Sequence, residues 1–83
     1  MMAVLRGGLL LYKEEAIGNI DGYNDTFLAS FPFIPGTLRV HLNGLEQNSP
    51  IDYVELNSQT IQFVNPPLGG IDADEVTLEY QRS

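Results

Sequence analysis

The 83-residue sequence has no cysteine, one histidine, and only four lysine or arginine residues against eleven acidic ones. Without cysteine the chain can form neither disulfides nor thiolate zinc sites, and one histidine is too few for a histidine-based metal cage. The formal net charge of −7 disfavours binding to a phosphate backbone, which requires clustered cations. We therefore expect no cofactor, no metal and no nucleic-acid partner.

Long hydrophobic runs are also missing. The apolar run at residues 9–12 is far too short to span a bilayer, and three charged residues follow it at positions 13–15. The apolar stretch is thus shorter than the core of a secretory signal. We expect a protein made in the cytoplasm that is not secreted and has no membrane partner.

The small size of the chain limits its core. A chain of this length forms one domain and buries only a little over ~60% of its unfolded surface. Domains of this size often depend on disulfides, metals or partners, and the composition leaves partners. Oligomerisation or docking on a larger body is therefore expected.

The most informative stretch is residues 36–45, where strict alternation runs into an Asn-Gly pair. Its inward-facing positions are Leu38, Val40 and Leu42, and its outward-facing positions are Thr37, Arg39 and His41. Asn43 and Gly44 tolerate the positive φ angles of a two-residue type I′ turn. A half-buried strand and an antiparallel return strand are predicted.

Short extended segments recur at residues 26–29, 51–56, 60–64 and 75–80, with turn signals between them. In the last segment Val76, Leu78 and Tyr80 are predicted to face inward. This spacing is typical of a β-sandwich. We predict an all-β fold, a compact antiparallel sandwich of about six or seven short strands, over residues 19–83.

Residues 1–18 lack this rhythm and carry the flexible pair Gly7-Gly8. Two interpretations stay open: an edge strand of the sandwich, or an N-terminal arm that lies on a neighbour. A short helix over residues 13–17, stopped by Gly18, is a further option.

Two apolar segments have uncertain pairing, residues 9–12 and 31–34. The prolines of residues 31–36 cannot donate to a central ladder, so this connection is expected at an edge or between the sheets, capping the core. A small domain has little interior for both segments. The candidate interface residues are Leu9, Leu10, Leu11, Tyr12, Phe31, Phe33 and Ile34.

Several motifs follow one another over residues 19–80: Asp21-Gly22-x-Asn24-x-x-Phe27, Pro35-Gly36-x-Leu38-x-Val40-x-Leu42-Asn43-Gly44-Leu45, Asp52-Tyr53, Ile61-x-Phe63, Pro66-Pro67 and Val76-x-Leu78-x-Tyr80. Their order resembles a small β-sandwich module of tailed-bacteriophage virion proteins, found in capsid decoration, tail-tip and fibre proteins. That pattern usually has Gly-Asp soon after the prolines, whereas this chain has the longer Gly69-Gly70-Ile71-Asp72.

The resemblance implies a structural role without catalytic residues, so we do not expect an enzyme. A free-standing module of this kind looks like a capsid cement or decoration protein on the virion surface. It would bridge neighbouring subunits of the major capsid protein, commonly as a homotrimer. The alternatives are a tail, neck or baseplate component, or a carbohydrate-binding adhesin module.

Other polar and aromatic residues have weaker functional interpretations. Two groups offer oxygen ligands for calcium, Asp21 with Asn24 and Asp25, and Asp72 with Asp74 and Glu75. Neither has the spacing of an EF-hand. Turn chemistry explains the first group, and a charged edge that discourages sheet pairing explains the second.

The tyrosines could provide stacking surfaces for a sugar; they are Tyr12, Tyr23, Tyr53 and Tyr80. Tyr53 and Tyr80 are expected to close the core, and Tyr23, in a polar turn, to be the most exposed. No base, nucleophile or orienting carboxylate is indicated beside His41, so an interface contact or a solvated position is expected there.

Substituting Leu10 and Leu11 with serine should release the protein from its oligomer or capsid and leave the sandwich folded, because these residues belong to a predicted contact segment. Light scattering and circular dichroism would measure the two effects. Loss of the fold would show that both leucines are core residues.

Overall fold

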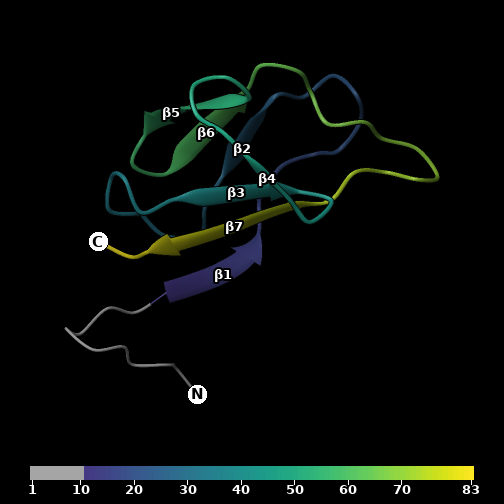
Figure 1. Cartoon of the computed structure of the whole chain (residues 1–83). Helices are drawn as coiled ribbons and strands as arrows, with labels where there is room; N and C mark the ends of the chain where they lie inside the picture. The colour runs from purple at the N-terminus through teal and green to yellow at the C-terminus, as the bar shows by residue number, and fades with distance from the viewer. Residues whose placement is uncertain (1–10) are drawn as a thin grey trace.

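Seven strands form two antiparallel sheets in the computed structural model, which describes residues 11–83 (Figure 1). The four-stranded sheet has the order β1 (Leu11–Glu15), β7 (Val76–Gln81), β3 (Arg39–Leu42) and β4 (Leu45–Gln47). The three-stranded sheet has the order β2 (Thr26–Leu28), β6 (Thr60–Phe63) and β5 (Tyr53–Asn57). The predicted all-β sandwich of about six or seven short strands is confirmed.

The chain passes back and forth between the two sheets. β1 lies in the four-stranded sheet, β2 in the other, and the β3–β4 and β5–β6 hairpins occupy the two sheets in turn. β7 then returns to the first sheet and inserts between β1 and β3. The last strand in sequence is therefore a central strand.

The hydrophobic core lies between the inner faces of the sheets. Val76, Leu78 and Tyr80 of β7 are buried and alternate with half-buried neighbours, as the period of two predicts. The rings of Phe27 and Phe63 pack edge to face, with 5.6 Å between their centroids. The buried hydrophobic residues are Phe27, Ala29, Phe33, Leu38, Val40, Tyr53, Ile61, Phe63, Val76, Leu78 and Tyr80.

The β3–β4 hairpin forms at the predicted Asn-Gly pair. Asn43 has a φ of 54° and Gly44 a φ of 83°, the signs that a type I′ turn requires at both central positions. Leu42 and Leu45 are directly opposite across the turn. This part of the sequence prediction is confirmed in detail.

β1 is an edge strand, and the alternative of a helix over residues 13–17 is wrong. Leu11, Lys13 and Glu15 face solvent, whereas Tyr12 and Glu14 point inward, which is the period of a strand. Pairing with β7 outweighs the weak helix propensity of Lys-Glu-Glu-Ala. The edge-strand interpretation therefore holds for residues 11–15.

A seam between β1 and β2 connects the two sheets. Ile17 and Leu28 exchange two backbone hydrogen bonds, of 2.8 and 2.9 Å. Further along the seam the Glu14 carboxylate replaces the backbone as partner, accepting hydrogen bonds from the Ser30 amide (2.8 Å) and the Ser30 hydroxyl (2.5 Å). The same carboxylate accepts a 2.5 Å hydrogen bond from the Tyr80 hydroxyl.

The connection over residues 31–34 continues from Ser30 along the same side of the sandwich and also joins the two sheets. The Ile34 amide donates to the Gln81 carbonyl (2.9 Å), and the Phe33 amide donates to the Ser58 carbonyl in the β5–β6 turn (2.7 Å). The expectation that this segment lies between the sheets and caps the core is confirmed.

The Glu14 carboxylate is ionised in the fold. Burial alone would raise its pKa, but hydrogen bonds from the Ser30 side chain, Tyr80 and the Ser30 amide outweigh burial and hold the pKa of Glu14 below its ordinary value. Burial first, and then the hydrogen bond to Glu14, raises the pKa of Tyr80 above the ordinary range of a phenol. At neutral pH the Glu14 carboxylate is therefore anionic and accepts a hydrogen bond from the neutral Tyr80 hydroxyl.

We predict that Glu14→Gln lowers the free energy of unfolding at pH 7 by about 1 kcal/mol, because an amide cannot accept at both ends. Since folding lowers the pKa of Glu14, its contribution is present above its unfolded pKa of about 4.5 and is lost as the pH falls through the folded value. Thermal unfolding from neutral to acidic pH measures both effects. The matched control is Glu15→Gln on the solvent-facing side of β1; identical profiles for the two variants would contradict the prediction.

Candidate interaction site

The predicted interface residues of the described chain gather at one margin of the sandwich, where β1 begins and β7 ends. Tyr12 and Phe31 contact each other edge to face, with 5.4 Å between ring centroids and an interplanar angle of 90°. Leu11, beside Tyr12, is 50% exposed. Segments that lie 19 positions apart in the sequence thus form one cluster, whereas Leu9 and Leu10 lie outside the described residues.

The two remaining candidates are more enclosed. Phe33 is 1% exposed and belongs to the core, with its ring centroid 5.8 Å from that of Tyr80. Ile34 is half-buried beside it. Of the seven candidates, those with accessible surface in the described chain are Leu11, Tyr12, Phe31 and Ile34.

Arg82 completes this cluster, and the sequence analysis missed it. Its guanidinium carbon lies 3.6 Å from the ring centroid of Phe31 and 6.0 Å from that of Tyr12. A guanidinium over an aromatic face is a favourable cation–π arrangement. The sequence signal for this contact was that Arg82 directly follows the last predicted strand. A bridge between Phe33 and Arg82 brings the arginine beside residues 31–34.

A shallow depression adjoins this cluster on the outer face of the four-stranded sheet. Its lining residues are Leu11, Gly36, Thr37, Arg39, Glu79 and Gln81. Glu79 is the cross-strand neighbour of both Lys13 and Arg39, so charges of alternating sign run across this face. The face suits a polar protein contact around an apolar edge.

His41 lies on the same outer face, opposite Thr77 on β7 and Glu46 on β4. A second shallow depression is lined by Lys13, His41, Gly44, Glu75 and Thr77. The Thr77 hydroxyl and the His41 imidazole both line this depression, but the hydrogen bonds of residues 11–83 include none between them of the kind that a nucleophile and its base make. His41 is half-buried there, and a solvated position or an interface contact stays a prediction.

The first acidic group holds a turn together. Oδ1 of Asp21 accepts hydrogen bonds from the amides of Tyr23 (2.9 Å) and Asn24 (2.8 Å). The hydrogen bond from the Asn24 amide, followed by that from Tyr23, lowers the pKa of Asp21 below its ordinary value. The Asn24 side-chain amide donates to the carbonyls of Asn19 (3.1 Å) and Thr26 (3.0 Å). These are the turn contacts expected from the sequence.

The second acidic group does not protect an exposed strand edge, and that expectation is wrong. Asp72, Asp74 and Glu75 precede β7, which is flanked by β1 and β3. Oδ1 of Asp74 accepts from the side-chain amide of Asn43 (2.8 Å), and Oδ2 accepts from the Leu68 amide (2.8 Å). Asp74 bonds to other parts of the chain because β7 is a central strand, and the sequence did not show that β7 is central. Within residues 11–83 no group of three histidine, cysteine or acidic side chains could hold a metal ion.

Asn43 has a second role beyond the type I′ turn. The side-chain Oδ1 of Asn43 accepts a 2.8 Å hydrogen bond from the backbone amide of Glu75. The backbone amide of Asn43 donates a 2.8 Å hydrogen bond to the Glu75 carbonyl. The turn of the β3–β4 hairpin is thereby fastened to the start of β7. The hydrogen bond from Asn43, followed by that from Leu68, lowers the pKa of Asp74 below its ordinary value.

The four tyrosines differ in accessibility as the sequence suggested. Tyr80 is fully buried, Tyr53 is 4% exposed, and Tyr23 is 87% exposed. Tyr12 is half-buried within the cluster that it forms with Phe31 and Arg82. Tyr23 therefore offers the largest aromatic contact surface of these four.

Comparisons of the chain with protein-family models, curated proteins and solved structures return no match. Over residues 11–83, no helix has the length and apolar character needed to cross a membrane.

We predict that Asp74→Asn lowers the melting temperature, because an amide cannot accept from both Asn43 and Leu68. Amide hydrogen exchange at Leu68 should also become faster. The matched control is Asp72→Asn, which makes the same charge change at an exposed neighbouring position. Equal melting temperatures for the two variants would argue against a structural role for Asp74.

Proposed function

We propose that this protein is a structural component of a bacteriophage virion. Specifically, it acts as a capsid cement or decoration protein that binds neighbouring subunits of the major capsid protein. The proposal rests on the resemblance of residues 19–80 to the virion β-module, supported by the way the motif residues are used in the fold.

The supporting observation is that motifs far apart in the sequence interlock. The Gly22 amide of the Asp-Gly motif donates 3.0 Å to the Pro67 carbonyl of the Pro-Pro motif. Asn43 of the Asn-Gly motif is bonded to Asp74, in the segment that the family pattern places before the last strand. The motifs are thus bonded to one another in the folded protein. This favours their being parts of one module over their being unrelated turn signals.

The roles of these residues are those expected of a module used as a building block. The side chains of Asp21 and Asn24 bond to the backbone, and that of Asp74 bonds to the backbone and to the Asn43 side chain. Accessible apolar surface instead lies at the margins, for example at Leu11. A protein that stabilises a shell needs only such contacts, because the many copies in one particle make modest affinities effective.

We expect a homotrimer, which would suit local threefold positions of a shell. The accessible part of the aromatic margin, Leu11 and Tyr12 with Phe31 and Arg82, is the proposed contact between copies. Its apolar edge and outward charges resemble the composition of a protein interface more than that of a ligand pocket.

The test is the copy number of the protein in purified virions of the phage that encodes it, measured by quantitative mass spectrometry. A cement protein is present at a copy number comparable with that of the major capsid protein. A small number set by tail symmetry would instead assign the protein to the tail, neck or baseplate. Absence from washed virions would contradict a structural role altogether.

A further inference from the structure

Two loops distant in sequence form a single body at one end of the sandwich. Residues 16–25 connect β1 to β2, and residues 64–75 connect β6 to β7. A hydrogen bond joins Gly22 to Pro67, and a Cβ on Gly69 would lie 2.6 Å from the Ile20 carbonyl oxygen and 2.7 Å from the Asp21 Cα. Only glycine permits this approach. We name residues 19–24 and 66–75 together the loop end.

The second loop has a closed base and a projecting tip. The Asp74 amide donates 2.8 Å to the Leu68 carbonyl, and the Leu68 amide donates 2.8 Å to Asp74 Oδ2. Residues 69–73 therefore project beyond a clasp of two hydrogen bonds. Ile71, in the middle of this projection, is 103% exposed, which means that its side chain has no cover at all.

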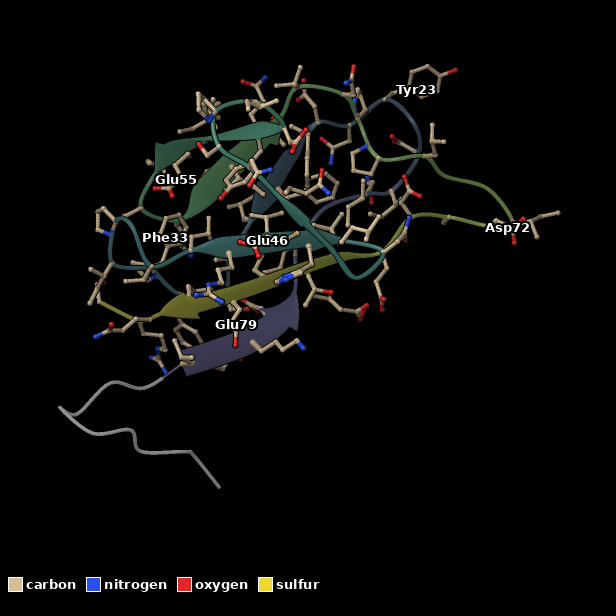
Figure 2. The ribbon with its side chains drawn as sticks, in the orientation of Figure 1. Tyr23, Phe33, Glu46, Glu55, Asp72 and Glu79 are labelled. Carbon is tan, nitrogen blue, oxygen red and sulfur yellow. The ribbon has the colours of Figure 1, made fainter. Side chains whose placement is uncertain are left out.

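Two more apolar side chains are exposed on the loop end. Tyr23 is 87% exposed and Leu68 is 65% exposed. Figure 2 shows Tyr23 and Asp72 toward the same end of the molecule, away from Glu55. Large apolar side chains held in place by a folded base resemble the anchors of protein interfaces, because little conformational freedom is lost when they bind.

The charge of the loop end is of one sign. It carries Asp21, Asp72, Asp74 and Glu75, and the sequence has no lysine, arginine or histidine in residues 14–38 or 42–81. Among the cations of the described chain, Arg39 lies on the outer sheet face and Arg82 over Phe31. Lys13, also on the outer sheet face, meets the loop end only at its boundary, where it lines a depression together with Glu75. A complementary surface would present apolar pockets rimmed by lysine and arginine.

We propose that the loop end is the docking surface for the phage particle, inserting Ile71 and Tyr23 into an apolar, lysine- and arginine-rimmed site on the major capsid protein. The identity of this partner rests on the proposed function, whereas the docking chemistry rests on the loop end itself. The aromatic margin is left for contacts between copies, so the two surfaces have separate tasks.

The experiment measures binding of labelled protein to shells and to tails, each purified from phage that lacks the gene. Ile71→Ser and Asp72→Lys alter the loop end. Ile51→Ser and Glu55→Lys make the same changes at exposed positions elsewhere, Ile51 being 74% exposed. Unchanged melting temperatures would show that all four variants fold, as is expected for exposed side chains.

We expect each loop-end variant to bind shells about tenfold more weakly than the wild type, and each control to stay within about twofold. Added salt should weaken binding of the wild type. The same pattern on tails would support the loop end as the docking surface and overturn the cement function. Equal binding by all four variants would overturn the loop end but leave the cement function standing.

Two further outcomes would overturn the proposal. Wild-type protein that binds neither shells nor tails contradicts both the docking surface and the virion function. A smaller mass for Ile71→Ser than for the wild type in light scattering would show that the loop end contacts a second copy of the chain.

Discussion

The hydroxyl of Tyr80 imposes the central constraint on this sandwich. Tyr80 is fully buried between the sheets, and a buried hydroxyl without an acceptor is costly. Glu14 on the edge strand supplies that acceptor and also holds Ser30 on the opposite side of the seam. One carboxylate thus connects the central strand β7, the edge strand β1 and the chain leaving β2. The hydrogen bonds of Glu14 favour its ionised form, and the Ile17–Leu28 backbone hydrogen bonds cross the same seam without it.

At the far end of the sandwich, hydrogen bonds of side-chain amides and carboxylates hold the chain segments together, as apolar burial does in the core. Asn43 and Asp74 connect a hairpin turn to the approach to β7, and Asp21 organises the turn against which Gly69 packs. This polar framework leaves apolar side chains free to face outward. The thin core and the exposed apolar side chains therefore have the same cause, because a domain this small can bury only part of its apolar surface.

Much of the fold was predictable because its signals are local. Alternation identified the inward faces of β3 and β7, and Asn43-Gly44 specified its own turn. The roles of Glu14 and Asp74 were not predictable, because both depend on which strand lies beside β1 and on β7 being central. Arg82 was missed for the same reason, since its aromatic partners come from segments about 50 and 70 residues away along the chain. Of the candidate contact residues, alternation could not show that Phe33 lies in the core.

The central place of β7 has a consequence for biosynthesis. Tyr80 and Glu14 are separated by 66 positions. Until residues 76–81 have emerged from the ribosome, β1 has no strand partner in its sheet and β3 has only its hairpin partner β4. Until then the nascent chain can form its hairpins but not the four-stranded sheet, so the apolar side chains of that sheet stay exposed. The acidic composition of the intervening chain would keep such incomplete molecules apart by mutual repulsion.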